Sequence, residues 1–89
     1  SGVLVVDVIP GSPAEDGGMR GATRQVRVGN SLIGIGGDVI VEVDGRDVNA
    51  TEEVSAVLEP RRPGERIQVT VIRNKRRLDL ELTLQEESP

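Results

Sequence analysis

The 89-residue sequence contains no cysteine, no histidine and no aromatic residue. Without cysteine, the chain can form neither a disulfide nor a thiolate metal site. The absence of histidine removes the usual zinc ligand, and the two absences together exclude Ser-His-Asp and Cys-His catalysis within the chain. The carboxylates are spread among turns and helix starts, and no nucleophile has a base beside it. We therefore expect no catalytic residue, no metal site and no cofactor in this chain.

Long apolar runs and an excess of positive charge are also missing. No stretch approaches the roughly 20 apolar residues that a membrane-spanning helix needs. The formal net charge is −4, whereas binding to phosphates needs a net basic face. Direct membrane insertion and nucleic-acid binding are therefore not expected. The chain starts at Ser1 without a signal peptide, which indicates a piece of a longer protein.

What the sequence does contain predicts one small, mainly β domain. A chain of this length buries only about 60 to 65% of the surface that it exposes when unfolded. Because aromatic residues are absent, the core must be built from valine, isoleucine and leucine. Valine is abundant, and its branched side chain favours strands.

The first informative segment runs from Gly2 to Met19. Seven of the eight residues from Val3 to Pro10 are uncharged, which predicts a strand covered on both faces. Ser12-Pro13-Ala14-Glu15 then places a hydroxyl at the N-cap, a proline at the first helical position and a carboxylate three residues after the cap. This is the capping-box pattern of a helix start, and Gly17-Gly18 ends the helix soon after it begins.

The second informative segment runs from Gly37 to Val48. Its valines alternate with other residues over 39–43, which predicts a strand, and Asp44-Gly45 predicts a tight reversal into a short pairing partner. Between the two segments, valines alternate with polar residues before Gly29-Asn30. We predict a hairpin inserted over residues 20–37, with its turn at this Gly-Asn pair.

The C-terminal half predicts one helix and two strands. Asn49 or Thr51 is expected to cap a helix that runs to Glu59 and turns an apolar stripe of valines and Leu58 toward the sheet. Two alternating segments over 67–73 and 78–84 follow, joined by a two-residue turn at 74–75. The basic residues around this turn predict a solvated hairpin tip, with contact to another part of a parent protein as the minority hypothesis: Arg73, Lys75, Arg76 and Arg77. Residues 86–89 predict a frayed tail.

In this order, the segments resemble the PDZ domain of bacterial trypsin-like HtrA/Deg serine proteases. In that family a strand, the sequence Pro-Gly-Ser-Pro-Ala, a glycine with a hydrophobic residue, and a Gly-Asp strand ending in Asp-Gly follow one another, as they do here over 2–45. The resemblance continues through 51–58, 62–65 and the last two strands, so it covers nearly all of residues 1–89. It implies a single PDZ domain, an α+β fold that is mainly β with two short helices, arranged as a β-sandwich or partly open barrel with HtrA-type strand order.

The resemblance also implies a binding site. PDZ domains bind the C-terminal end of a peptide as an extra strand between a sheet edge and a helix. By alignment with the family, Thr51, Ser55 and Leu58 face the peptide, and Leu58 lines the pocket for its last side chain. The alternatives that remain are a helix cap for Thr51 and a core position for Leu58.

The other wall of this groove is not evident in the sequence. In HtrA-type domains the peptide-receiving strand and its carboxylate loop precede the strand that starts here at Gly2, so we expect an open sheet edge in their place. Leu32-Ile33-Gly34-Ile35 resembles the carboxylate loop, but four common residues are a weak match and we favour coincidence. If the match is functional, the amides of Ile33, Gly34 and Ile35 bind the carboxylate.

The expected partners follow from the same resemblance. They are hydrophobic C-termini or unfolded segments of substrates, together with the protease domain of a parent protein in the bacterial cell envelope. Two alternatives stay open. One is a PDZ module of a site-2 or C-terminal processing protease, and the other is a structural module that self-associates through its open sheet edge.

Overall fold

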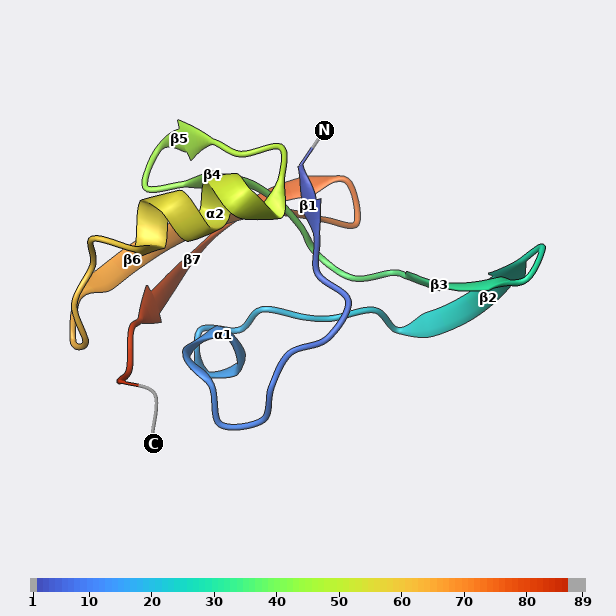
Figure 1. The fold of residues 1–89 in the computed structure, drawn as a ribbon, viewed down its shortest axis with the longest axis horizontal. Helices are drawn as coiled ribbons and strands as arrows, with labels where there is room; N and C mark the ends of the chain where they lie inside the picture. Colours follow the sequence, from blue (N-terminus) through green and yellow to red (C-terminus); the bar gives the residue numbers. More distant parts are fainter. Residues whose placement is uncertain (1, 87–89) are drawn as a thin grey trace.

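A computed structural model describes residues 2–86, and Figure 1 shows their arrangement. The chain forms seven strands and two short helices in this region, so the prediction of a mainly β fold with two helices is confirmed. Residues 87–89 of the predicted tail lie outside the described residues. The elements are β1 (Val3–Leu4), α1 (Pro13–Asp16), β2 (Arg24–Val28), β3 (Ser31–Ile35), β4 (Val39–Val43), β5 (Arg46–Asp47), α2 (Thr51–Leu58), β6 (Arg66–Arg73) and β7 (Arg76–Thr83).

The strands form one open antiparallel sheet and one separate hairpin. The larger sheet has the order β1-β4-β6-β7, and β5 pairs with the same edge of β4 as β1. Within residues 2–86 this sheet ends at β1 and β7, so the fold is not a closed barrel. The strands β2 and β3 pair only with each other, as the predicted inserted hairpin requires.

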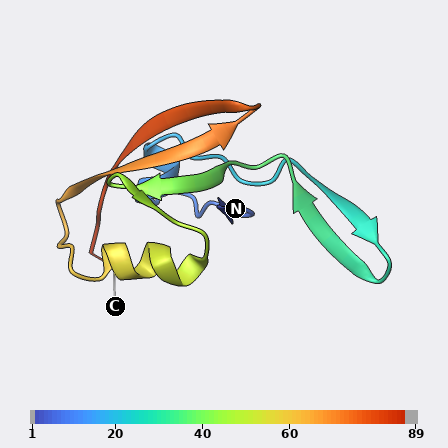
Figure 2. The ribbon, with the colours of Figure 1, turned by 90° about the horizontal axis from the view of Figure 1, so that it is seen from above.

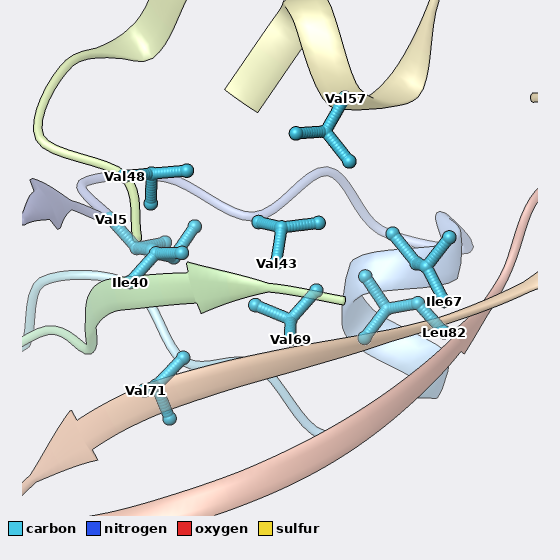
Figure 3. Packing of buried hydrophobic residues seen from close by; sticks show 9 residues of the cluster. All are labelled: Val5, Ile40, Val43, Val48, Val57, Ile67, Val69, Val71 and Leu82. Carbon is cyan, nitrogen blue, oxygen red and sulfur yellow. The ribbon is translucent and has the colours of Figure 1, made fainter. Parts of the chain in front are cut away.

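The core lies between this sheet and α2, and it is aliphatic, as the composition predicts. In Figure 3, Val57 points from α2 toward the sheet side chains, among them Val43. Val71 is completely buried and Val43 is 1% exposed, because β4 and β6 are the central strands. The alternation predicted for the last two strands is confirmed, since β6 and β7 turn their aliphatic residues to the same face of the sheet.

The three predicted two-residue turns are present, at 29–30, 44–45 and 74–75. At the first, Gly29 has φ 60° but Asn30 has no positive φ, whereas the other two use left-handed backbone at both central positions. Asp44 has φ 49° and Gly45 has φ 80° between β4 and β5. Asn74 has φ 52° and Lys75 has φ 67° between β6 and β7. Positive φ at both central positions is typical of the hairpin turn whose twist matches that of the flanking strands.

The helix starts agree with the sequence in one case and differ in the other. At α1, the Ser12 hydroxyl accepts the Glu15 N–H at 3.3 Å, which confirms Ser12 as the predicted N-cap. The Glu15 carboxylate accepts the N–H of Gly11 at 3.0 Å, one residue before the cap, instead of the N–H of Ser12. At α2, the prediction that Asn49 or Thr51 caps the helix is wrong. The N-cap is Ala50, which makes no side-chain cap bond, and the Glu53 carboxylate instead accepts the Asn49 N–H at 3.0 Å.

The prediction that the first strand is covered on both faces is also wrong. β1 spans only two residues, and Leu4 and Val6 are 44% and 45% exposed. Val5, between them, is buried at 8% exposure. The reason is that successive side chains of an extended segment point to opposite faces: Val5 points into the core, while Leu4 and Val6 point to the other face, where they stay nearly half exposed.

The β2–β3 hairpin projects from the rest of the molecule as an arm, which Figure 2 shows most clearly. We use the term arm for residues 24–35. Its stem is closed where the chain enters and leaves: the Asp38 N–H donates to the Arg20 carbonyl at 3.0 Å, and the Asp38 carboxylate accepts the Arg20 N–H at 2.9 Å. The arm is therefore an insertion whose two ends are joined by hydrogen bonds, and it lies beside the core without contributing to it.

Candidate functional site

Three residues predicted to bind a peptide lie on one stripe of α2. Thr51, Ser55 and Leu58 are spaced by four and then three residues, which places them on the same side of a helix. Thr51 and Ser55 are exposed, whereas Leu58 is half-buried where α2 ends. The neighbouring stripe carries Val57 into the core, so packing of α2 fixes the direction of the exposed stripe.

The open edge of β1 offers the second structural feature of this site. The Val5 N–H donates to the Asp38 carbonyl at 2.8 Å, so it points toward the β4 side of the strand. Because successive residues of a strand direct their backbone groups to opposite sides, the N–H and C=O of Leu4 point away from β4. No strand within residues 2–86 pairs with that side. The Ala22 N–H donates to the Val6 carbonyl at 2.8 Å and closes the edge beyond this point.

The residues of the alternative carboxylate loop lie elsewhere. Ile33, Gly34 and Ile35 form part of β3, and each is in register with a residue of β2. Figure 2 shows that the arm points away from the part of the molecule where α2 lies. The structure therefore does not bring these three residues together with the exposed stripe of α2.

Two surface pockets lie away from α2. One follows β6 and β7 and is lined by residues that include Asp44, Arg66 and Glu81. The other lies between the loop before α1 and the end of the described chain, beside Ile9 and Glu86. Neither is lined by the predicted peptide-facing residues, so the candidate site consists of a helix stripe and a strand edge.

Comparison with known proteins assigns the family. Residues 1–84 match the PDZ domain family. The chain belongs to the PDZ family. As a PDZ domain it is a peptide-binding or protein-interaction module, and such a domain is non-catalytic by itself.

The PDZ domain also resembles a solved structure along its length. The solution structure of GtR34C from Geobacillus thermodenitrificans is 28% identical and superimposes with a TM-score of 0.65, covering 98% of this chain and 82% of that one. A comparison with curated proteins finds no match.

Within residues 2–86, no group of three or more acidic, histidine or cysteine side chains is arranged to hold a metal ion. No helix among these residues is long and apolar enough to span a membrane.

A buried ion pair is the main polar feature that sequence reasoning missed. Asp38 is 1% exposed and accepts the Nε–H and Nη2–H of Arg73, both at 2.8 Å. Arg73 also donates to the Gly18 carbonyl at 2.7 Å. The hydrogen bonds from Arg73 hold the pKa of the Asp38 carboxyl below its usual value, against the opposing effect of burial.

This network corrects the prediction of a solvated basic hairpin tip at Arg73 alone, since Lys75, Arg76 and Arg77 are exposed as predicted. Arg73 is only 18% exposed in its side chain and serves a structural role in the PDZ domain. Arg77 contacts Glu42 at 2.9 Å, although its side chain is 58% exposed. Asp38 of the Gly-Asp pair could have indicated this ion pair in the sequence, because an aspartate at the start of a buried strand needs a partner.

Proposed function

We propose that this PDZ domain is the peptide-binding module of an HtrA/Deg-type serine protease of the bacterial cell envelope. It captures hydrophobic C-termini or unfolded segments of substrates and regulates the protease domain of its parent protein. The observation that carries the proposal is the order of motifs: a Pro-Gly-Ser-Pro-Ala segment follows β1, and a Gly-Asp pair precedes β4. This order is the one on which the resemblance to HtrA-type domains rests.

The geometry supports peptide binding along α2. A bound peptide lies beside the stripe formed by Thr51, Ser55 and Leu58, and Leu58 contacts its last side chain. Backbone hydrogen bonds supply affinity in this binding mode, while side-chain pockets supply specificity. The half-buried position of Leu58 suits a residue that contacts an apolar side chain on one side and the core on the other.

Regulation follows if occupancy of the site changes the protease domain. Peptide binding can influence a distant active site only through a difference in affinity between two states of the parent protein. The PDZ domain contributes that difference, and the catalytic residues belong to the other domain, since this chain has neither histidine nor cysteine.

The test is an NMR titration of the isotope-labelled chain with a peptide that ends in valine, leucine or phenylalanine. The peptide with a free carboxylate should shift the amide signals of residues 51–58, whereas the C-terminal amide of the same peptide should not. Ser55→Gln should weaken binding because its side chain faces the peptide. Ala56→Gln is the matched control, since Ala56 is also exposed on α2 but lies on a different side.

The same titration on the full-length parent protein separates two negative results. Binding there but not to residues 1–89 means that residues outside this chain complete the site, and the proposal stands. Absence of binding to both, or equal binding of the acid and the amide, contradicts recognition of C-termini. A parent protein without a trypsin-like protease domain contradicts the HtrA assignment.

A further inference from the structure

The most exposed large apolar side chains of the described residues form two groups. The first group lies on the arm and the second lies in the N-terminal segment, which we define as residues 2–19. The exposed members are Val28, Leu32 and Ile33 on the arm and Leu4, Val6 and Ile9 in the N-terminal segment. Large apolar side chains that cluster at the surface mark interaction sites more often than scattered ones do.

The two groups carry opposite charge. The arm contains Arg24 and Arg27 and no acidic residue. The N-terminal segment contains Asp7, Glu15 and Asp16 and no basic residue. Within residues 2–86, no ion pair includes Arg24 or Asp7. The two surfaces are therefore complementary both in charge and in apolar character.

One face of the arm collects most of its apolar side chains. Cross-strand partners share a face of a hairpin, and side chains alternate between faces along each strand. The register therefore places four apolar residues on one face, with Arg24 at its base. We call them the apolar arm face: Val26, Val28, Ile33 and Ile35.

The opposite face of the arm is the one that the rest of the molecule approaches. It carries Gly34, and a Cβ atom added there would lie 3.3 Å from Cγ1 of Val6 and 3.0 Å from Cβ of Ala22. It also carries Leu32, which is as exposed as Val28 at 59%. Since an isolated two-stranded hairpin is marginally stable in water, the apolar arm face gains stability if another surface covers it.

We propose that the apolar arm face packs against the N-terminal segment of a second copy of this chain, with Arg24 beside Asp7 of that copy. The arm cannot cover the loop around Ile9 of its own copy, because it points away from that loop (Figure 1). Two copies that exchange arms make the same contact twice and close a symmetric dimer. Packing of arm against arm is disfavoured, since the arm contains no acidic residue that could pair with Arg24 of the other copy.

The expected dimer is weak and sensitive to salt. A standard stable interface involves about 20 to 30 residues on each side, and the arm face with its target offers fewer. We expect a dissociation constant between about 10 µM and about 1 mM. Raising the salt concentration should weaken it further, because the exposed charge pair is screened.

Analytical ultracentrifugation of the whole chain over that concentration range tests the proposal. The chain should show a monomer–dimer equilibrium, and Val28→Ser should raise its dissociation constant about tenfold. Leu32→Ser is the matched control, because Leu32 has the same exposure but lies on the opposite face. It should leave the dissociation constant unchanged.

Charge exchange tests the predicted orientation. Arg24→Glu should weaken the dimer, and adding Asp7→Arg to that variant should restore it, whereas Arg27→Glu on the other face should have less effect. A chain that stays monomeric at about 1 mM overturns the proposal. So does a dimer that persists in both Val28→Ser and Arg24→Glu, which would place the contact elsewhere, for example at the β1 edge. Amide spectra of each variant verify that the fold is retained.

Discussion

The Asp38 carboxylate and the Arg73 guanidinium form a two-bond ion pair across 35 positions of sequence, with both N···O distances at 2.8 Å. The pair joins the start of β4 to the end of β6, and Arg73 extends it to the carbonyl of Gly18. Asp38 also binds the backbone of Arg20, at the stem of the arm. One carboxylate thus fixes the positions of three chain segments.

Removal of this carboxylate should destabilise the domain. Asp38→Ala leaves Arg73 largely buried without its partner, which costs about 3 kcal/mol. Since a domain of this size is stable by about 5 to 10 kcal/mol, the loss should be evident in urea unfolding. Glu42→Ala is the control, because its ion pair with Arg77 is more exposed and should contribute less than about 1 kcal/mol. Equal effects of the two substitutions would contradict a special role for Asp38.

The stability contributed by Asp38 should depend on pH in a defined direction. The folded domain lowers the pKa of this carboxyl below the value of about 3.9 in the unfolded chain. Its contribution is therefore fully present above that value and is lost as the pH falls through it toward the lowered folded pKa. The difference in free energy of unfolding between the wild type and Asp38→Asn should be constant near pH 7 and shrink below about pH 4. If this difference in free energy of unfolding instead grew on acidification, the folded domain would not favour the charged form of Asp38.

Local patterns predicted much of the fold. The alternation over β6 correctly identified Ile67, Val69 and Val71 as buried, because these positions face the core with a period of two. It did not predict the burial of Thr70 on the other face, which is 4% exposed and donates its hydroxyl to Asp79 at 2.7 Å. The Asp44-Gly45 pair predicted its turn because few residue types accept positive φ at two successive positions. The resemblance to the PDZ family selected Thr51, Ser55 and Leu58, and their spacing by four and three residues explains why they share one stripe of α2.

Features that depend on distant parts of the chain were not predictable in this way. The pairing of Asp38 with Arg73 exists only after β4 and β6 have come together. The exposure of Leu4 and Val6 depends on which face of their segment packs on the core, not on the apolar residues of the segment itself. The distance of Ile33 from α2 depends on the direction of the arm, which no local pattern encodes.

Gly37 should tolerate no side chain. A Cβ atom there would lie less than 3.0 Å from the carbonyl oxygen of Val5 and from the backbone nitrogen of Ala22. Because both neighbours are backbone atoms, Gly37→Ala should cost about 2 kcal/mol or more, measured by thermal or urea unfolding. Gly29→Ala separates crowding from backbone conformation, since Gly29 has φ 60° but open space around it. Gly29→Ala should lower the free energy of unfolding by only about 1 kcal/mol. A larger loss for Gly29→Ala than for Gly37→Ala would contradict the crowding argument.

The arm should be removable without loss of the fold. Deleting residues 24–35 joins Thr23 directly to Gly36, which already lie next to each other at the base of the arm. None of the buried core residues belongs to the arm, and the bonds between Arg20 and Asp38 still close the stem. The free energy of unfolding should therefore change by no more than about 1 kcal/mol, since a shorter loop also costs less entropy to close. Cooperative urea unfolding and a well-dispersed amide spectrum would verify this result. A molten or unfolded product would contradict this prediction. It would mean that the arm stabilises the core.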